Sequence, residues 1–206
     1  MKSLRTIAQP SRKNFISGLA ALALLAACGG ESARAQTTVL SFENIPDTYL
    51  YRAGNQNLGT YYPGLNFGPH VTVFDQVRYG YNSADFPPHS GNAVISGYGV
   101  DQPLRVDFLG FQCTFVDAWY TSNGALSLNA YDAADNLLAT TTSPGNYPAK
   151  NTLISVSAPD IAYVTFYNGN MNSLTLDDFG YTPVPEPTVL VLLAVGGVAV
   201  LRRRRT

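Results

Sequence analysis

The stretch NTLISVSAPDIAYVTFY, residues 151–167, decides the fold class of this chain. Apolar side chains occupy every second position, with Ile154 and Val156 in the first half and Val164 and Phe166 in the second. A period of two places these side chains on one face of an extended strand and polar side chains on the other. The stretch therefore predicts two half-buried antiparallel strands.

The same alternation recurs along the middle of the chain, where no helical period of useful length is found. Strands are expected over residues 38–42, 71–79, 93–96, 104–108, 111–120, 124–132, 151–158, 161–167 and 174–181. Turn residues separate them, as in Ser90-Gly91-Asn92 and Ser143-Pro144-Gly145-Asn146. The pattern predicts an all-β fold: a single jelly-roll-like β-sandwich over residues 36–182. An immunoglobulin-like topology is the alternative, because a pattern does not give strand order.

Positively and negatively charged residues are distributed unevenly along the chain. Nine of the 13 Lys and Arg residues lie before residue 36 or after residue 201, which leaves four cations against 12 acids in residues 36–182. The central segment therefore carries a net charge of 4 − 12 = −8. Such an acidic domain, almost without lysine, disfavours nucleic acid and anionic membrane surfaces as partners.

The first 35 residues predict a secretory signal peptide. Basic residues as far as Lys13 precede an apolar run, residues 16–27, which is too short to remain as a membrane-spanning helix. Ala33-Arg34-Ala35 suits signal peptidase cleavage before Gln36, and this reading is favoured. Leu25-Ala26-Ala27-Cys28 resembles a lipoprotein lipobox, which would make Cys28 a lipidated N-terminus instead.

Residues 183–206 contain three distinctive parts in order. Val184-Pro185-Glu186-Pro187 precedes an apolar run, residues 189–201, and the chain ends in a basic cluster of Arg202, Arg203, Arg204 and Arg205. A helix of this length covers roughly 20 Å, less than a bilayer core, so it predicts a marginal, transient membrane anchor. The arginines predict a cytoplasmic C-terminus and an exported domain at the cell envelope or outside it.

This tail resembles the PEP-CTERM sorting signal in all three parts. The resemblance implies that an exosortase, a membrane processing enzyme, acts near Pro185, Glu186 and Pro187. It covers only about two dozen residues and concerns the handling of the protein, because exported domains with this tail differ widely.

Three short motifs of the central segment are Ser41-Phe42-Glu43, Ser90-Gly91-Asn92 and Leu176-Asp177-Asp178-Phe179. With them, the segment resembles galactose-binding-like β-sandwich modules. In such modules, acids from the first and last strands meet at a structural calcium ion, which implies Glu43, Asp177 and Asp178 as candidate ligands. Calcium prefers six to eight oxygen ligands. The alternative is that Asp177 and Asp178 are solvated residues at a strand end.

Thirteen tyrosines give the chain many amphipathic rings, and several lie beside Asn, Gly and Asp in the first half. Such rings stack on sugars while polar neighbours bond hydroxyl groups, so Tyr61, Tyr62, Tyr79 and Tyr81 are candidate glycan-binding residues. Outward-facing tyrosines are equally ordinary in β-proteins.

Catalysis has little support in the sequence. His70 and His89 lie in no zinc-binding or nucleophile-elbow pattern, and Glu43 is the only glutamate between residues 36 and 182. Cys113 alternates with apolar neighbours and is expected to be a buried free thiol. The favoured hypothesis is a non-enzymatic surface or matrix protein that binds glycan, with extracellular polysaccharide as the candidate ligand. A self-associating structural envelope protein and an uncharacterised hydrolase are the alternatives.

Overall fold

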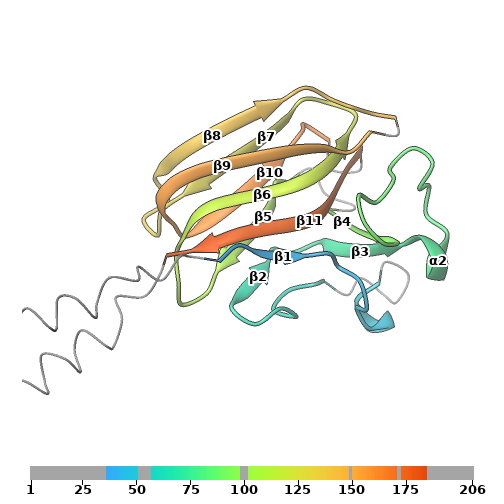
Figure 1. Cartoon of the computed structure of the whole chain (residues 1–206), viewed down its shortest axis with the longest axis horizontal. Helices are drawn as coiled ribbons and strands as arrows, with labels where there is room; N and C mark the ends of the chain where they lie inside the picture. The colour runs from blue at the N-terminus through green and yellow to red at the C-terminus, as the bar shows by residue number, and fades with distance from the viewer. Residues whose placement is uncertain (1–35, 51–56, 98–101, 149, 171–172, 185–206) are drawn as a thin grey trace, which may run out of the picture. The chain divides into compact units, whose positions relative to one another are not determined.

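A computed structural model describes residues 36–50, 57–97, 102–148, 150–170 and 173–184. The expected signal peptide with Cys28, and the tail from Pro185 through Arg202, Arg203, Arg204 and Arg205, lie outside the described residues. The described chain confirms the expected all-β fold. It forms two antiparallel sheets that face each other in a sandwich (Figure 1).

The first sheet has the order β3-β4-β11-β6-β9, and β1 also pairs with β11. Its strands are β1 (Thr38–Leu40), β3 (Val71–Asp75), β4 (Ala93–Gly97), β6 (Cys113–Ser122), β9 (Thr152–Ile161) and β11 (Leu174–Pro183). The second sheet has the order β2-β5-β10-β7-β8. Its strands are β2 (Leu65–Phe67), β5 (Leu104–Phe108), β7 (Leu126–Tyr131), β8 (Leu137–Ser143) and β10 (Tyr163–Tyr167).

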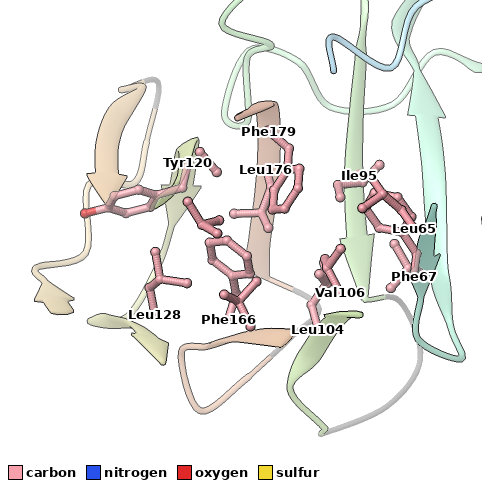
Figure 2. Packing of buried hydrophobic residues seen from close by; sticks show 14 of the residues in the cluster. Leu65, Phe67, Ile95, Leu104, Val106, Tyr120, Leu128, Phe166, Leu176 and Phe179 are labelled. Carbon is pink, nitrogen blue, oxygen red and sulfur yellow. The ribbon is translucent and has the colours of Figure 1, made fainter. Parts of the chain in front are cut away.

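The core fills the space between the two sheets. Side chains from both sheets meet there, and Figure 2 labels Leu65, Phe67, Leu104, Val106, Leu128 and Phe166 from the second sheet and Ile95, Tyr120, Leu176 and Phe179 from the first. Each large apolar side chain buried in this way stabilises the fold by roughly 1.5–3 kcal/mol. The Tyr120 hydroxyl donates to the Pro144 carbonyl at 2.8 Å, so even the polar end of this buried ring is satisfied.

The expected strand over residues 71–79 is wrong in its second half. The strand ends at Asp75, and a one-turn helix follows, α2 (Gln76–Tyr79). The Asp75 carboxylate accepts hydrogen bonds from the backbone N–H groups of Val77 and Arg78 at 2.9 and 2.8 Å, and Gly80 ends the turn in the left-handed conformation. Asp before and Gly after a helical turn are capping signals that outweigh the strand pattern here.

Two strands were not expected from the sequence. β2 has only three residues, and β8 reads LLATTTS, which lacks the alternation of apolar side chains. Within the described chain β8 pairs with β7 alone, and all seven of its side chains are half-buried or exposed. A strand at the edge of a sheet needs no regular apolar face, so the pattern gave no signal for it.

The two ends of the sandwich domain meet. β1 pairs antiparallel with the last part of β11, with Thr38 opposite Tyr181, at the left of the strands in Figure 1. The hydroxyl oxygens of Thr37 and Thr182 lie 2.7 Å apart. Among the described residues, none of the helices has the length and apolar character needed to cross a membrane.

Candidate functional site

The outer face of the second sheet presents a cluster of aromatic and charged side chains. Val106 of β5 and Val164 of β10 point into the core, so the alternate residues Arg105, Asp107 and Tyr163 project from the opposite face. The register places Tyr163 beside Asp107 on one side and beside Tyr131 of β7 on the other. We call this surface the β5–β10–β7 face.

Arg105 organises the β5–β10–β7 face. Its Nε donates to Asp107 Oδ1 at 2.7 Å, and its guanidinium carbon lies 3.6 Å from the centre of the Tyr163 ring. The other neighbour of Tyr163 is Tyr131, whose ring is nearly parallel at 8° with centroids 4.7 Å apart. A cation–π contact and a stacked pair therefore hold the three side chains in a fixed arrangement.

Hydrogen-bonding groups surround these rings. Asn66 Nδ2 of β2 donates to Asp107 Oδ2 at 3.2 Å, and the Tyr163 hydroxyl donates to Asp135 at 3.0 Å. Burial, together with Asp135, raises the pKa of Tyr163, so its hydroxyl remains a donor. Tyr163 itself is only 8% exposed, because Arg105 and Tyr131 cover its ring. Tyr131 therefore offers the ring contact for apolar C–H surface, while the guanidinium, amide and carboxylate groups beside it can bond hydroxyl groups.

A second group of polar residues lies on the outer face of the first sheet, where the acids of β11 hold a loop. Asp177 is 1% exposed, and its Oδ2 accepts hydrogen bonds from the backbone N–H groups of His89 and Ser90 at 2.7 and 2.8 Å. Asp178 accepts from the Ser90 hydroxyl at 2.8 Å and contacts His89 Nδ1 at 2.7 Å. Burial raises the pKa of Asp177 to about 6, and the neighbouring Asp178 carboxylate adds to this effect.

Glu43 holds the other end of the same loop. Its Oε1 accepts hydrogen bonds from the backbone N–H groups of Asn92 and Ala93 at 2.8 and 2.9 Å. Gly91 has a φ of +56°, and a Cβ at this position would overlap the Glu43 side chain. Only glycine therefore allows both the turn and the approach of the carboxylate.

The three predicted calcium ligands thus all contact residues 89–93, but they do so by accepting hydrogen bonds from the N–H and O–H groups of this loop. We call this arrangement of Glu43, Asp177 and Asp178 the loop clamp. No group of three His, Cys, Asp or Glu side chains suited to a metal ion occurs in the part of the chain that the structure describes. Glu43 Oε1 and both carboxylate oxygens of Asp177 and Asp178 already bond protein donors, so the arrangement fits a loop clamp better than a calcium sphere. Thermal melting in calcium and in EDTA tests calcium binding at Glu43, Asp177 and Asp178.

His89 is held on the same surface. Its imidazole ring stacks on the Trp119 indole, with centroids 3.7 Å apart and planes 6° from parallel. Ser90 donates its hydroxyl proton to Asp178, which His89 also contacts, so the serine is not bonded to the histidine. This arrangement lacks the serine–histidine contact that activates a nucleophile.

The four predicted glycan-binding tyrosines fall into two different surroundings. Tyr61 packs on Tyr49 and Tyr62, with centroids 4.9 and 5.0 Å apart, and both Tyr61 and Tyr62 pack against the core. Burial raises the pKa of Tyr62 to about 12. Tyr79 ends α2 and also packs against the core, whereas Tyr81 contacts Phe74 of β3. Their role in glycan binding remains a prediction.

Cys113 is buried and free, as the sequence predicted. Burial raises the pKa of its thiol to about 12. The thiolate needed for nucleophilic attack is therefore suppressed at neutral pH.

No protein-family model and no curated protein sequence matches this chain. Among solved structures it is similar to mutants of a family 29 carbohydrate-binding module, for example at 14% identity over 72% of this chain and 92% of that chain, with a TM-score of 0.41. Module CsCBM6-3 from Clostridium stercorarium, in complex with cellobiose, is 13% identical over 57% of this chain and 86% of that one, with a TM-score of 0.36. Arabinose-bound MgGH51 α-L-arabinofuranosidase is 15% identical over 75% of this chain and 27% of that one, with a TM-score of 0.41. Likenesses this distant transfer no ligand or activity to this chain.

The sequence alone does not indicate Arg105, Tyr131 or Tyr163 as functional residues. The alternation in residues 161–167 does put Tyr163 on the polar face of its strand. The pattern could not show that Arg105 of β5 and Tyr131 of β7 flank it, because that depends on the strand order β5-β10-β7.

Proposed function

We propose that this chain is an exported, non-enzymatic cell-surface protein whose β-sandwich binds extracellular polysaccharide on the β5–β10–β7 face. The observation that carries this proposal is the fixed column of Arg105, Tyr163 and Tyr131, with the amide and carboxylate of Asn66 and Asp107 beside it. Rings held by their neighbours lose little side-chain entropy when a ligand binds, which favours affinity.

The charge of the domain favours a neutral glycan. The net charge of −8 over residues 36–182 repels polyanions, and Arg105 already pairs with Asp107. A polysaccharide rich in hydroxyl groups needs no compensating cations. Its hydroxyls can instead bond the Asn66, Asp107 and Asn129 side chains on this face.

The sequence supports export by way of the signal peptide and processing of the PEP-CTERM tail by an exosortase. The backbone N–H of Val184 donates to the Gln112 carbonyl at 2.7 Å, so Pro185 follows directly on a residue bonded to the sandwich. In this proposal the tail anchors the protein transiently in the membrane while the domain lies outside. Cleavage near Pro187 then releases or transfers the domain to the surface.

Native affinity electrophoresis in gels that contain neutral polysaccharides tests the binding face. We expect retardation of the wild-type protein, and Tyr131→Ala should weaken binding by about tenfold through loss of a ring contact. Leu153→Ala is the control, because Leu153 is 46% exposed and lies on β9 of the first sheet, away from this face.

Equal binding by both variants would remove the β5–β10–β7 face from the proposal. Failure of the wild type to bind any polysaccharide of the panel would overturn the function itself. Concentration-dependent growth of particles in light scattering would then favour the self-associating structural protein.

A further inference from the structure

A pocket of about 200 Å³ lies on the outer face of the first sheet, separate from the β5–β10–β7 face. The segment after α2 covers it, and strands β3, β4 and β11 form its floor. Apolar walls come from Phe74, Phe86 and Leu174, and polar groups come from Tyr81, Asn82 and Ser96. Neither the loop clamp nor the proposed polysaccharide face accounts for this pocket.

The pocket region contains two unsatisfied hydroxyl groups. Tyr81 lines the pocket, and its hydroxyl is buried without a hydrogen-bond partner among the described residues. The buried hydroxyl of Thr72, which lies opposite Ser96 in the β3–β4 register, likewise lacks a partner in the described chain. Unpaired buried polar groups are costly and rare, so each of them calls for an explanation. The Tyr81 hydroxyl has almost no solvent-accessible surface, so a ligand with an acceptor oxygen would supply the missing partner after a small shift of the ring toward the pocket.

The surrounding charges restrict what can bind. The pKa of Tyr81 is raised by burial first and then by the carboxylates of Asp177, Asp75 and Glu43. The hydroxyl is therefore a neutral donor in a negative field, and an anionic ligand would be repelled. A cation would gain from the field but would find apolar walls and a donor in the pocket. The chemistry favours a neutral ligand that combines apolar surface with one acceptor.

We propose that this pocket binds the acetyl group of an acetylated sugar, an inference that rests on the proposed glycan-binding function. The acetyl carbonyl accepts the hydrogen bond from Tyr81, and the methyl group packs against Phe74, Phe86 and Leu174. The volume is sufficient, since an apolar cavity of about 150 Å³ already holds a benzene molecule. Asn82 is exposed at the rim, where sugar hydroxyl groups would lie.

The two surfaces make the sandwich bivalent in this proposal. The β5–β10–β7 face belongs to the second sheet, whereas β3, β4 and β11 belong to the first, and the core separates the two outer faces. One molecule can then contact a polysaccharide chain on one side and an acetylated residue on the other. Simultaneous contacts of this kind would increase avidity without any new contact at either site.

The experiment compares two probes that differ in one group, methyl N-acetyl-β-glucosaminide and methyl β-glucoside, titrated into the full-length protein and followed by ligand-observed NMR. We expect the acetylated probe to bind more tightly, with the difference lost in Tyr81→Phe. Removal of one neutral hydrogen bond should cost up to about tenfold in affinity. Tyr81→Phe removes an unpaired buried hydroxyl, so its thermal midpoint should equal or exceed that of the wild type.

Tyr131→Ala is the control, because it changes the β5–β10–β7 face and leaves the pocket intact. It should lower polysaccharide binding while the preference for the acetylated probe persists. A preference that survives in Tyr81→Phe, or equal or absent binding of both probes by the wild type, overturns the pocket proposal. Polysaccharide retardation that persists in that case leaves the proposed function standing.

Discussion

At the scale of single residues, Asp177 links the last strand to the loop that covers the first sheet. Its carboxylate is 1% exposed and accepts backbone hydrogen bonds from His89 and Ser90, which lie 88 and 87 positions away in the sequence. These bonds favour the ionised form, yet burial is the larger effect and raises the pKa to about 6. The carboxylate is therefore bound tightly in a setting that penalises its charge.

This pKa predicts a specific pH dependence of stability. The folded state holds the Asp177 proton more tightly than the unfolded chain, whose aspartates titrate near pH 4. The stability that Asp177 contributes is therefore full below about pH 4 and is lost as pH rises through about 6. We expect urea denaturation to show the wild type losing stability relative to Asp177→Asn over that interval.

Asp132→Asn is a control of opposite sign. Asp132 accepts hydrogen bonds from the Asn136 side chain and backbone, which lower its pKa. The stability that Asp132 contributes is present at neutral pH and is lost as the pH falls through its lowered pKa. If the difference in the free energy of unfolding between the wild type and Asp177→Asn stayed constant from pH 4 to 7, the pKa assigned to Asp177 would be contradicted.

At the scale of elements, the pairing of β6 with β11 contains an irregularity that positions the two acids. The register shifts between Asp177 and Gly180, and Asp178 adopts a φ of +44°. Gly180 faces Asp117 of β6, and a Cβ at Gly180 would overlap the Asp117 carboxylate. A bulge with a glycine beside it thus turns Asp177 and Asp178 toward the same loop.

Gly180→Ala should destabilise the fold by roughly 2 kcal/mol, because the methyl group overpacks the strand pair. Gly110→Ala is a steric control, since nothing lies within 4 Å of the position that its Cβ would take and only its φ of +83° opposes the change. That variant should lose roughly 1 kcal/mol. Urea midpoints measure both values, and equal losses would show that overlap with Asp117 is not the cause.

The loop clamp makes a prediction about metal. Glu43, Asp177 and Asp178 already bond donors of residues 89–93, so we expect the same thermal midpoint in calcium and in EDTA. A fall of several degrees in EDTA, restored by calcium, would instead support the metal site implied by the sequence resemblance.

At the scale of the whole molecule, the sandwich begins and ends at one place. β1 runs beside the end of β11, and Val184 bonds Gln112 in the connection that leads into β6. The first and last described residues of the sandwich, Gln36 and Val184, therefore lie next to strands that pair with each other.

A disulfide tests this closeness. Thr37 and Thr182 lie opposite each other, one position beyond the paired residues Thr38 and Tyr181. The Cα–Cα distance of such an antiparallel pair is one that a disulfide can bridge. The double variant Thr37→Cys/Thr182→Cys should form the bond under oxidising conditions and gain about 2–4 kcal/mol, lost again on reduction. Each single cysteine variant is a control, and failure of the bond to form would contradict the β1–β11 pairing.

The sequence by itself determined the all-β class, most strand positions and the burial of Cys113, because alternation at period two is a local property of the chain. The sequence also indicated Glu43, Asp177 and Asp178 as site residues, although it did not predict that they form the loop clamp. Only the tertiary structure decided strand order, and with it the meeting of Arg105, Tyr163 and Tyr131. These features depend on pairing between residues far apart in the chain. A local sequence pattern does not show which strands pair.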